Sequence, residues 1–299
     1  MAESSSPLRD VLARCRTLLA EAEEGSVGQS DTEHDHAREA QLLVSGVLRL
    51  APGALAQRSA RGDRLSAGEL AQVEQALHRR LRGEPLAYAV GWAPFRHLEL
   101  MVDARVLIPR PETEEVVGHA LALTADRPGG VAVDIGTGSG AIALALASEG
   151  RFEKVVATDV SADALAVAEA NAAALPAGHA PVEFRLGADL APLAGLRPRV
   201  IVSNPPYIAY DEAGALPPSV RDWEPPLALY AADGGMARYR ALLHGARSLL
   251  EPGGWLVLEL DATRAQQTAR EARALDWQDV VVHSDLAGRD RVLTARTPT

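Results

Sequence analysis

The chain has 299 residues, of which 47% are hydrophobic and 23% are charged, the proportions of an ordinary soluble globular protein with one large or two modest domains. Its formal net charge of −10 excludes a general electrostatic attraction to nucleic-acid phosphates, and no apolar stretch is long enough to span a membrane. The single cysteine, Cys15, excludes an internal disulfide and fits a reducing compartment, so we expect a cytoplasmic protein. We also expect a monomer, because the sequence carries no heptad run and no apolar surface stripe.

The first part of the chain is expected to form a small helical domain over residues 1–84. Leucine and valine recur there at helical spacing, and the stretch 21–33 is rich in glycine, serine and acidic residues, which indicates a loop. The segment Ser66-Ala67-Gly68-Glu69 is a capping box and predicts the start of a third helix, which continues through Leu81.

A group of possible metal ligands follows the loop of this domain, with Asp31 and Glu33 beside His34 and His36. The spacing of the two histidines puts them on different faces of a helix. No further histidine or cysteine stands at ligand spacing elsewhere in the chain. We therefore interpret the group as a solvated acidic loop and predict no metal site.

Residues 85–108 are expected to form a β-hairpin linker. From Tyr88 to Val106 the helical pattern gives way to short aromatic and β-branched runs, interrupted at Trp92-Ala93-Pro94. Trp92 and Phe95 in this segment could cover a substrate pocket or pack a small linker core, and the sequence favours neither.

From residue 109 to the end of the chain, strand and helix patterns alternate, which is typical of an α/β fold with a doubly wound parallel sheet. The expected strands cover residues 131–135, 155–159, 182–186, 199–203, 255–260, 278–283 and 290–295. No helical pattern separates the last two strands. We therefore expect a seven-stranded sheet whose last strand is antiparallel.

A glycine-rich turn follows the first strand of this sheet directly. The segment Gly136-Thr137-Gly138-Ser139-Gly140 lies between the apolar strand and a helical run, an arrangement in which backbone approaches a ligand closely. Asp159 ends the next strand, about 20 residues after the glycines, where a carboxylate can hold ribose hydroxyls. The G-x-G-x-G spacing is shorter than that of dinucleotide sites. It therefore suits a nucleoside that has no pyrophosphate.

A second motif, Asn204-Pro205-Pro206-Tyr207, follows the strand that ends at Ser203. Two consecutive prolines continue neither a strand nor a helix, so the chain leaves the sheet in a rigid, extended turn. The turn offers an amide, carbonyl oxygens and an aromatic face. Such a set can hold a planar amine or amide by its N–H groups while stacking on its flat side.

Together these motifs resemble the class I S-adenosylmethionine-dependent methyltransferases, whose sheet is Rossmann-like, and within them the HemK/PrmC family of release-factor glutamine methyltransferases. The resemblance extends from about residue 83 to the end of the chain, with the family's motifs in family order. The matching segments are Leu107-Ile108-Pro109-Arg110-Pro111-Glu112-Thr113-Glu114, residues 134–147, residues 203–208, Trp223-Glu224-Pro225, Pro252-Gly253-Gly254 and residues 285–291.

The resemblance implies a role for each motif. Asn204 and the Pro205 carbonyl would accept hydrogen bonds from a glutamine amide, and Pro206 and Tyr207 would complete that acceptor site. Asn204 would also belong to the cofactor-binding residues. The backbone of residues 136–140 would surround the methionine part of S-adenosylmethionine, with Asp159 on the ribose. The resemblance further implies that Asp189 meets the adenine amino group and that Leu190, where some relatives carry an aromatic residue, packs on the adenine.

The family implies transfer of a methyl group to the glutamine of the Gly-Gly-Gln motif in peptide chain release factors, with the helical domain docking the substrate. Methylation of a ribosomal-protein glutamine stays open as an alternative, as does adenine-N6 methylation of DNA. The acidic balance and the lack of a target-recognition region stand against the DNA alternative. The glycine spacing disfavours a nicotinamide oxidoreductase. The intact motifs disfavour a non-catalytic binding module. Arg110 and Glu112 could brace the cleft or contact substrate, and both roles remain open.

Overall fold

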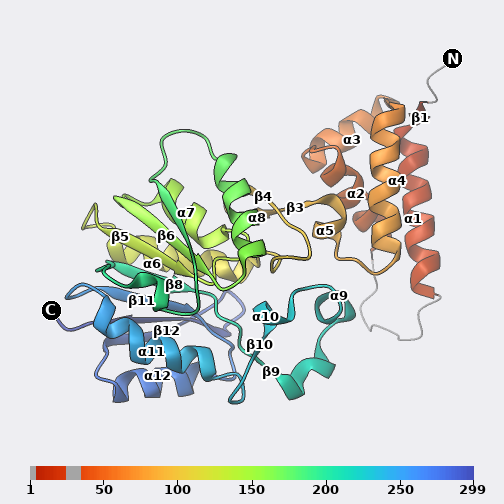
Figure 1. Ribbon diagram of the computed structural model, residues 1–299. Helices are drawn as coiled ribbons and strands as arrows, with labels where there is room; N and C mark the ends of the chain where they lie inside the picture. The colour runs from red at the N-terminus through yellow and green to blue at the C-terminus, as the bar shows by residue number, and fades with distance from the viewer. Residues whose placement is uncertain (1–4, 25–34) are drawn as a thin grey trace. The chain divides into compact units, whose positions relative to one another are not determined.

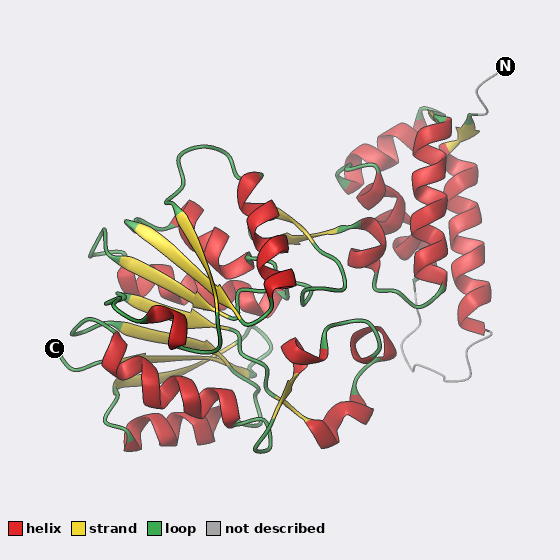
Figure 2. Cartoon of the chain, viewed as in Figure 1, coloured by secondary structure: helices red, strands yellow, loops and turns green. Residues whose placement is uncertain are grey.

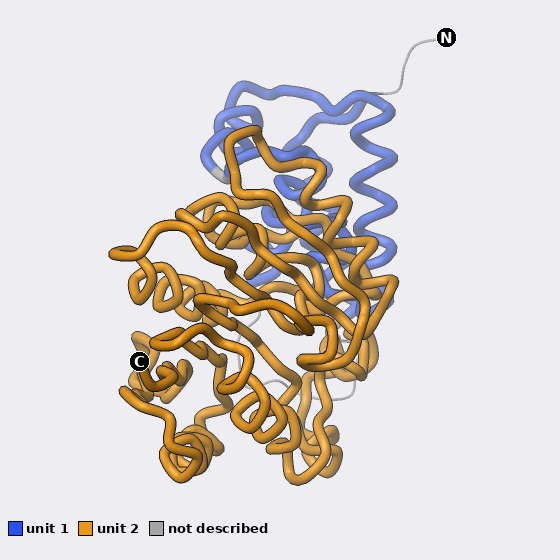
Figure 3. The backbone as a smooth tube through the Cα atoms, turned by 60° about the vertical axis from the view of Figure 1, so that its left-hand side comes forward, with its two compact units in different colours: residues 1–92 blue, residues 93–299 orange. Residues whose placement is uncertain are grey.

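A seven-stranded sheet forms the centre of the second part of the chain (Figures 1 and 2). The computed structural model describes residues 5–24 and 35–299, which fall into two compact units, residues 1–92 and 93–299 (Figure 3). The strands of the sheet are, in order across it, β12 (Gln278–Ser284), β13 (Asp290–Arg296), β11 (Trp255–Glu259), β8 (Val200–Ser203), β5 (Val131–Ile135), β6 (Lys154–Asp159) and β7 (Val182–Leu186).

The sheet confirms the fold that the sequence predicts. Each strand begins and ends within one residue of its expected position. β13 runs antiparallel to both of its neighbours, and the pairs from β11 through β8, β5 and β6 to β7 are parallel. The central strands are apolar on both faces because helices cover both sides of a parallel sheet.

Two helical layers enclose the sheet, and alternate residues of each strand face opposite layers. On one side α6 (Pro111–Thr124), α7 (Ala141–Glu149) and α8 (Ala162–Ala173) cover a core that includes Ala132 and Val200. On the other side α11 (Ala237–Leu249) and α12 (Ala265–Ala274) cover Val133 and Ile201. The order of the crossovers reverses between β5 and β8, since β6 and β7 lie on one side of β5 and β8 and β11 on the other. Ligands bind at such reversal points in open α/β sheets.

Short elements lie before α6 and after the carboxyl ends of β7 and β8. A parallel pair of two-residue strands lies between β8 and α11, and a two-stranded hairpin precedes α6. These elements are the hairpin β3 (Trp92–Phe95) and β4 (Leu98–Met101), the 3-10 helices η1 (Ala191–Leu193) and η2 (Tyr210–Ala215), the short helices α9 (Pro218–Arg221) and α10 (Pro226–Leu229), and the strands β9 (Ile208–Ala209) and β10 (Tyr230–Ala231).

The first unit is helical, as its leucine spacing predicts. Its core includes Leu8, Leu43 and Val73, and Cys15 is buried in it, which raises the pKa of the thiol to about 11. The elements of this unit are α1 (Leu8–Glu24), α2 (His36–Val47), α3 (Pro52–Ala60), α4 (Ala67–Leu81) and α5 (Leu86–Val90), with an antiparallel pair of short strands, β1 (Ser6–Pro7) and β2 (Arg64–Leu65).

Three details of this unit differ from the sequence expectations. Residues 21–24, expected at the start of a loop, form the end of α1. The capping box is present, with the Ser66 hydroxyl accepting from the Glu69 N–H group, but it opens the fourth helix because α3 was not anticipated. Residues 86–90, expected within the hairpin linker, are helical and end at Gly91, whose φ of 83° suits a helix terminus. Asp31, Glu33 and His34 lie outside the described residues. Within the described ranges, no helix is both long and apolar enough to cross a membrane.

Candidate active site

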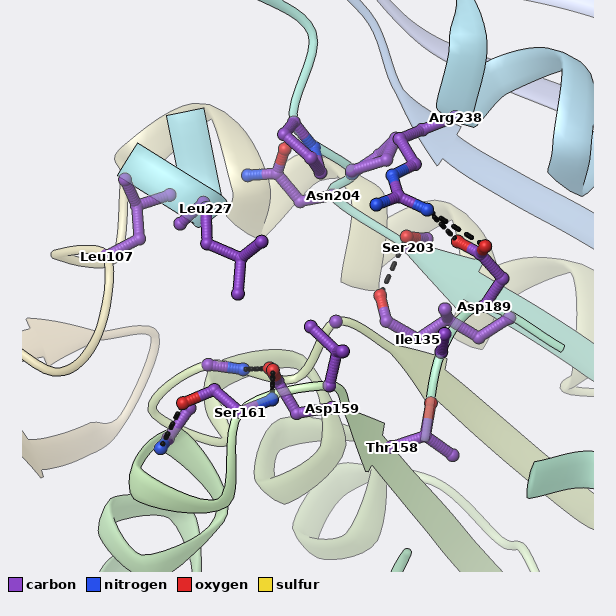
Figure 4. A pocket seen from close by; sticks show the side chains of 18 of the residues that line it. Leu107, Ile135, Thr158, Asp159, Ser161, Asp189, Ser203, Asn204, Leu227 and Arg238 are labelled. Carbon is purple, nitrogen blue, oxygen red and sulfur yellow. Dashed lines mark hydrogen bonds and ion pairs between the residues drawn. The ribbon is translucent and has the colours of Figure 1, made fainter. Parts of the chain in front are cut away.

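A cavity opens where β5, β6 and β8 end at one edge of the sheet (Figure 4). The segments that follow β5 and β8 form two parts of the cavity wall. The end of β6, the loop that follows β7, and the helix α10 form other parts. In Figure 4, Asn204 and Asp159 lie on opposite sides of this space, and Leu227 lies beside it. Of the residues that the sequence singles out, Gly136, Gly138, Asp159, Asp189, Asn204, Pro205 and Pro206 line the cavity.

The glycine loop supplies bare backbone to this cavity. Gly136 and Gly138 have φ angles of 74° and 54°, in the left-handed region that favours glycine. A Cβ atom at either position would meet no protein atom within 4 Å, so the space beside their backbone is open. Gly140 differs, because a Cβ atom there would come within 3.1 Å of Leu144. Gly140 therefore serves the packing of α7 rather than the cavity.

Thr137 and Ser139 do not line the cavity. The Thr137 hydroxyl donates a hydrogen bond of 2.6 Å to Asp134 Oδ2, and the Ser139 carbonyl accepts one of 2.8 Å from the Asn171 side chain. The same oxygen of Asp134 accepts from the Ala143 N–H group at 3.1 Å, which ties the loop to the first turn of α7. Burial raises the pKa of the Asp134 carboxyl to about 7, and its Oδ1 atom has no hydrogen-bond partner in the described part of the chain.

Asp159 ends β6 and holds the loop from the other side. Its Oδ2 atom accepts from the Gly138 N–H group at 2.9 Å, and its Oδ1 atom accepts from the Ser161 N–H group at 2.9 Å. Each carboxylate oxygen has more than one lone pair, so both can accept a further hydrogen bond from a ligand. The side chain is therefore fixed in orientation and still able to bind hydroxyl groups.

Asp189 lies in the loop after β7 with a φ of 48°, which asparagine and aspartate tolerate better than other non-glycine residues. Both of its carboxylate oxygens accept from Arg238 Nη1, at 2.7 and 2.8 Å. The sequence did not single out this arginine. Leu190 does not line the cavity, and its side chain packs toward Gly245 of α11 in the core.

Asn204 follows β8 and is half-buried. Its Nδ2 atom donates a hydrogen bond of 3.2 Å to the hydroxyl of Thr113, at the start of α6. Its Oδ1 atom makes no hydrogen bond to the described residues and is not fully buried, so this oxygen is available to a ligand. Tyr207 is not among the residues that line the cavity. Its ring packs against the core under α11 and α12, where burial raises the pKa of its phenol well above the usual value.

Thr113 also connects Asn204 to a carboxyl group that the sequence analysis missed. The Thr113 hydroxyl donates a hydrogen bond of 2.5 Å to Oε2 of Glu259, the last residue of β11. Burial raises the pKa of this carboxyl to about 7. A signal was present in the sequence, because Glu259 ends an apolar strand expected to share an edge of the sheet with Asn204.

The motif residues with open roles make contacts of their own. Arg110 donates a hydrogen bond of 2.5 Å to the buried Glu224, and Glu112 lies 3.7 Å from Arg289. Phe95 is buried in the core beneath α6 and α7. Within the first unit, Trp92 donates from its indole nitrogen to the Gly46 carbonyl at 2.9 Å. Neither aromatic side chain lines the cavity, which favours the packing interpretation for both.

A seven-stranded sheet with this strand order, a glycine loop after its first strand and an Asn-Pro-Pro-Tyr turn together define a methyltransferase of the Rossmann-like class. A crystal structure of a methyltransferase from Pyrococcus furiosus supports the fold, with a TM-score of 0.52 and 20% identity over 74% of this chain and 98% of that one. Residues 119–215 match the methyltransferase small domain family, and residues 10–91 match the PrmC N-terminal domain.

Closer relatives give the particular family. The release factor glutamine methyltransferase of Cereibacter sphaeroides is 40% identical over 262 residues, which cover 88% of this chain and 91% of that protein. The protein of the same name from Deinococcus radiodurans is 37% identical over 289 residues, covering 97% of this chain and 98% of that one. The chain belongs to the release factor glutamine methyltransferase family.

Proposed function

We propose that the chain transfers a methyl group from S-adenosylmethionine to the side-chain amide nitrogen, N5, of the glutamine in the Gly-Gly-Gln motif of peptide chain release factors. The observation that carries this proposal is the position of Asn204. Its available Oδ1 atom lies on the same cavity as the glycine loop and Asp159, so one cavity offers both an acceptor for an amide N–H group and a surface for a nucleoside. The names of the relatives support glutamine as the group that is methylated.

The glycine loop and the two aspartates fit the methyl donor. The open space beside Gly136 and Gly138 lets a ligand approach bare backbone, and the two free acceptor positions on Asp159 match a pair of ribose hydroxyls. Of the loop 136–140, we assign the cavity-lining backbone at Gly136 and Gly138 to the methionine part, and we assign Asp189 to the adenine amino group. When bound, the donor supplies an electrophilic methyl group whose leaving thioether is neutral, so the protein has no leaving group to protonate.

The acceptor poses the chemical difficulty, because the lone pair of an amide nitrogen is delocalised into the carbonyl. We assign Asn204 Oδ1 and the Pro205 carbonyl to the two N–H groups of the glutamine side chain. Two fixed acceptors orient the nitrogen and favour a localised lone pair as the new bond forms. Positioning of this kind can supply on the order of 7–11 kcal/mol of the barrier reduction in well-aligned systems.

No side chain needs to remove a proton before transfer, since the nitrogen becomes acidic only after methylation. Pro206 shapes the turn that presents these acceptors, because consecutive prolines allow few backbone conformations. Tyr207 and Leu190 are not among the residues that line this cavity, so the acceptor-site role of Tyr207 and the adenine contact of Leu190 stay predictions.

Release factors are proteins, and the net charge of −10 fits a protein substrate better than a nucleic acid. We assign residues 1–84 to substrate docking, residues 85–108 to a linker and residues 109–299 to catalysis. We place the activity in the cytoplasm, where it would support translation termination, and expect the enzyme to act as a monomer.

Transfer of a labelled methyl group from S-adenosylmethionine to purified release factor tests the proposal. A release factor whose Gly-Gly-Gln glutamine is replaced by alanine is the matched control, and a ribosomal-protein fraction and duplex DNA are parallel acceptors. Label on the wild-type factor and none on the alanine variant is the expected result. Label on ribosomal protein would support the same methyl-transfer reaction but with a ribosomal protein, and not a release factor, as the substrate. Label on DNA, or no label on any acceptor despite donor binding, would overturn the proposal.

A further inference from the structure

Three side chains form a chain of hydrogen bonds that ends at the cavity. Asn204 Nδ2 donates to Thr113 Oγ1 at 3.2 Å, and Thr113 Oγ1 donates to Glu259 Oε2 at 2.5 Å. The threonine and the glutamate are 4% and 2% exposed, so water does not compete for these bonds. The register of the sheet explains the arrangement. Leu258 of β11 pairs with Ser203 of β8, so the next residue on each strand is Glu259 and Asn204.

The direction of these bonds follows from the number of protons available. A threonine hydroxyl carries a single hydrogen, and an ionised carboxylate can only accept. When Glu259 is ionised, the Thr113 hydrogen must point to it. The Thr113 oxygen can then only accept from Asn204. The NH2 group of the asparagine must therefore face Thr113, which leaves Oδ1 as the free atom.

We propose that Thr113 and Glu259 are positioning residues, which fix the amide of Asn204 so that its oxygen, and not its nitrogen, faces the methyl acceptor. This inference rests on the proposed function, since an acceptor with two N–H groups needs an oxygen at this place. A reversed Asn204 amide would turn its NH2 group toward the N–H groups of the substrate amide. Two sets of hydrogen-bond donors would then face each other and repel the substrate.

The arrangement makes turnover depend on the ionisation of Glu259. Once protonated, the carboxyl can donate to Thr113, whose own hydrogen is then free to bind the asparagine oxygen and stabilise the reversed amide. Turnover should therefore rise with pH as Glu259 loses its proton, near a pKa of about 7. The charged and titratable groups around this carboxyl are Arg110 and Glu112 at the start of α6, Tyr207 after β8, Tyr239 on α11 and Arg291 on β13.

Four variants test the proposal by methyl transfer at saturating S-adenosylmethionine. Thr113→Val removes the hydroxyl at nearly constant volume and should lower kcat roughly 10- to 100-fold with little change in KM, because the amide is no longer held. Thr113→Ser keeps the hydroxyl and should restore most of the turnover. Thr124→Val is the matched control, since Thr124 is a buried threonine on the same helix whose hydroxyl bonds to the Ala120 carbonyl. Glu259→Gln should lack the rise in kcat that we expect for the wild type between about pH 6 and about pH 8.5. Asp134 titrates in both proteins, so the difference between their profiles isolates Glu259.

A second measurement does not depend on turnover. In protein labelled with 15N at asparagine, the side-chain NH2 signal of Asn204, assigned by its loss in Asn204→Ala, should be protected from exchange and should shift with pH near 7. Both properties should disappear in Thr113→Val and remain in Thr124→Val.

The proposal is overturned if Thr113→Val keeps the wild-type kcat, if Glu259→Gln keeps the wild-type pH profile, or if the Asn204 signal is the same in both threonine variants. If the wild-type enzyme methylates no release factor, the proposed function fails. The exchange measurement then still decides the orientation of Asn204 by itself.

Discussion

Arg110 and Glu224 lie 114 positions apart in the chain, and the Arg110 guanidinium donates a hydrogen bond of 2.5 Å to the Glu224 carboxylate. The glutamate side chain is 1% exposed and the arginine side chain 33%. The pair joins the residue that precedes α6 to the segment before α10. Pro225 at the end of that segment and Leu227 within α10 both line the cavity. We infer that Arg110 braces this wall, which is one of the two roles that the sequence left open for it.

Removal of the arginine should therefore be costly. Arg110→Ala leaves a buried carboxylate without its cation, and we expect a loss of about 3 kcal/mol in the free energy of unfolding. Adding Glu224→Gln to this variant should restore part of the loss, because a neutral amide is cheaper to bury than a charge. Urea unfolding of the two single variants and the double variant measures the coupling. Strictly additive effects would contradict a direct interaction.

The open space beside Gly138 predicts a selective effect on donor binding. Gly138→Ala and Gly129→Ala both place a Cβ atom on a residue with positive φ, and neither Cβ would meet a protein atom within 4 Å. Both should cost about 1 kcal/mol of stability from the backbone conformation. Only Gly138 lines the cavity, so only its variant should bind S-adenosylmethionine more weakly, by roughly 10-fold or more. Calorimetric titration of the two variants gives the comparison, and equal affinities would place the donor elsewhere.

Asp134 predicts a specific dependence of stability on pH. Its folded-state pKa of about 7 lies above the ordinary value of 3.8, so its stabilising contribution is complete below about pH 4 and is lost as the pH rises to about 7. Asparagine at this position does not titrate and can still accept from Thr137 and Ala143. The free energy of unfolding of the wild type, minus that of Asp134→Asn, should therefore fall by on the order of 2–3 kcal/mol between pH 5 and pH 8. Unfolding curves at the two pH values measure the change. A constant difference would mean that the carboxyl titrates at its ordinary pKa.

Asn204→Ala separates methyl transfer from donor binding. The substitution removes one of the two acceptors assigned to the glutamine amide, so we expect turnover to fall by at least about 100-fold. The glycine loop and Asp159 are untouched, and the affinity for S-adenosylmethionine should stay within a modest factor. Single-turnover methyl transfer and equilibrium donor binding measure the two quantities separately. Retained turnover would remove Asn204 from the chemistry, and lost donor binding would move it to the donor site.

Much of the fold was predictable from the sequence because its signals are local. The apolar runs at Val131–Ile135 and Val200–Ser203 are strands buried on both faces, and a run of this kind has few other structures available to it. The glycine turn and the paired prolines are local as well, since they act through backbone angles. The cavity residues Gly136, Asp159 and Asn204 were found for the same reason.

Tertiary structure decided which side chains meet. The bond from Thr113 to Glu259 spans 146 positions, and no periodicity in the sequence specifies it. Packing also placed the partly buried side chains of Tyr207 and Leu190 against the core beneath α11 and α12, because contact with other apolar groups removes apolar surface from water. The sequence by itself determined the strands, the turns and the chemical groups at the edge of the sheet. The partners and the orientation of those groups depend on contacts between distant residues, which form only when the sheet and its helices pack.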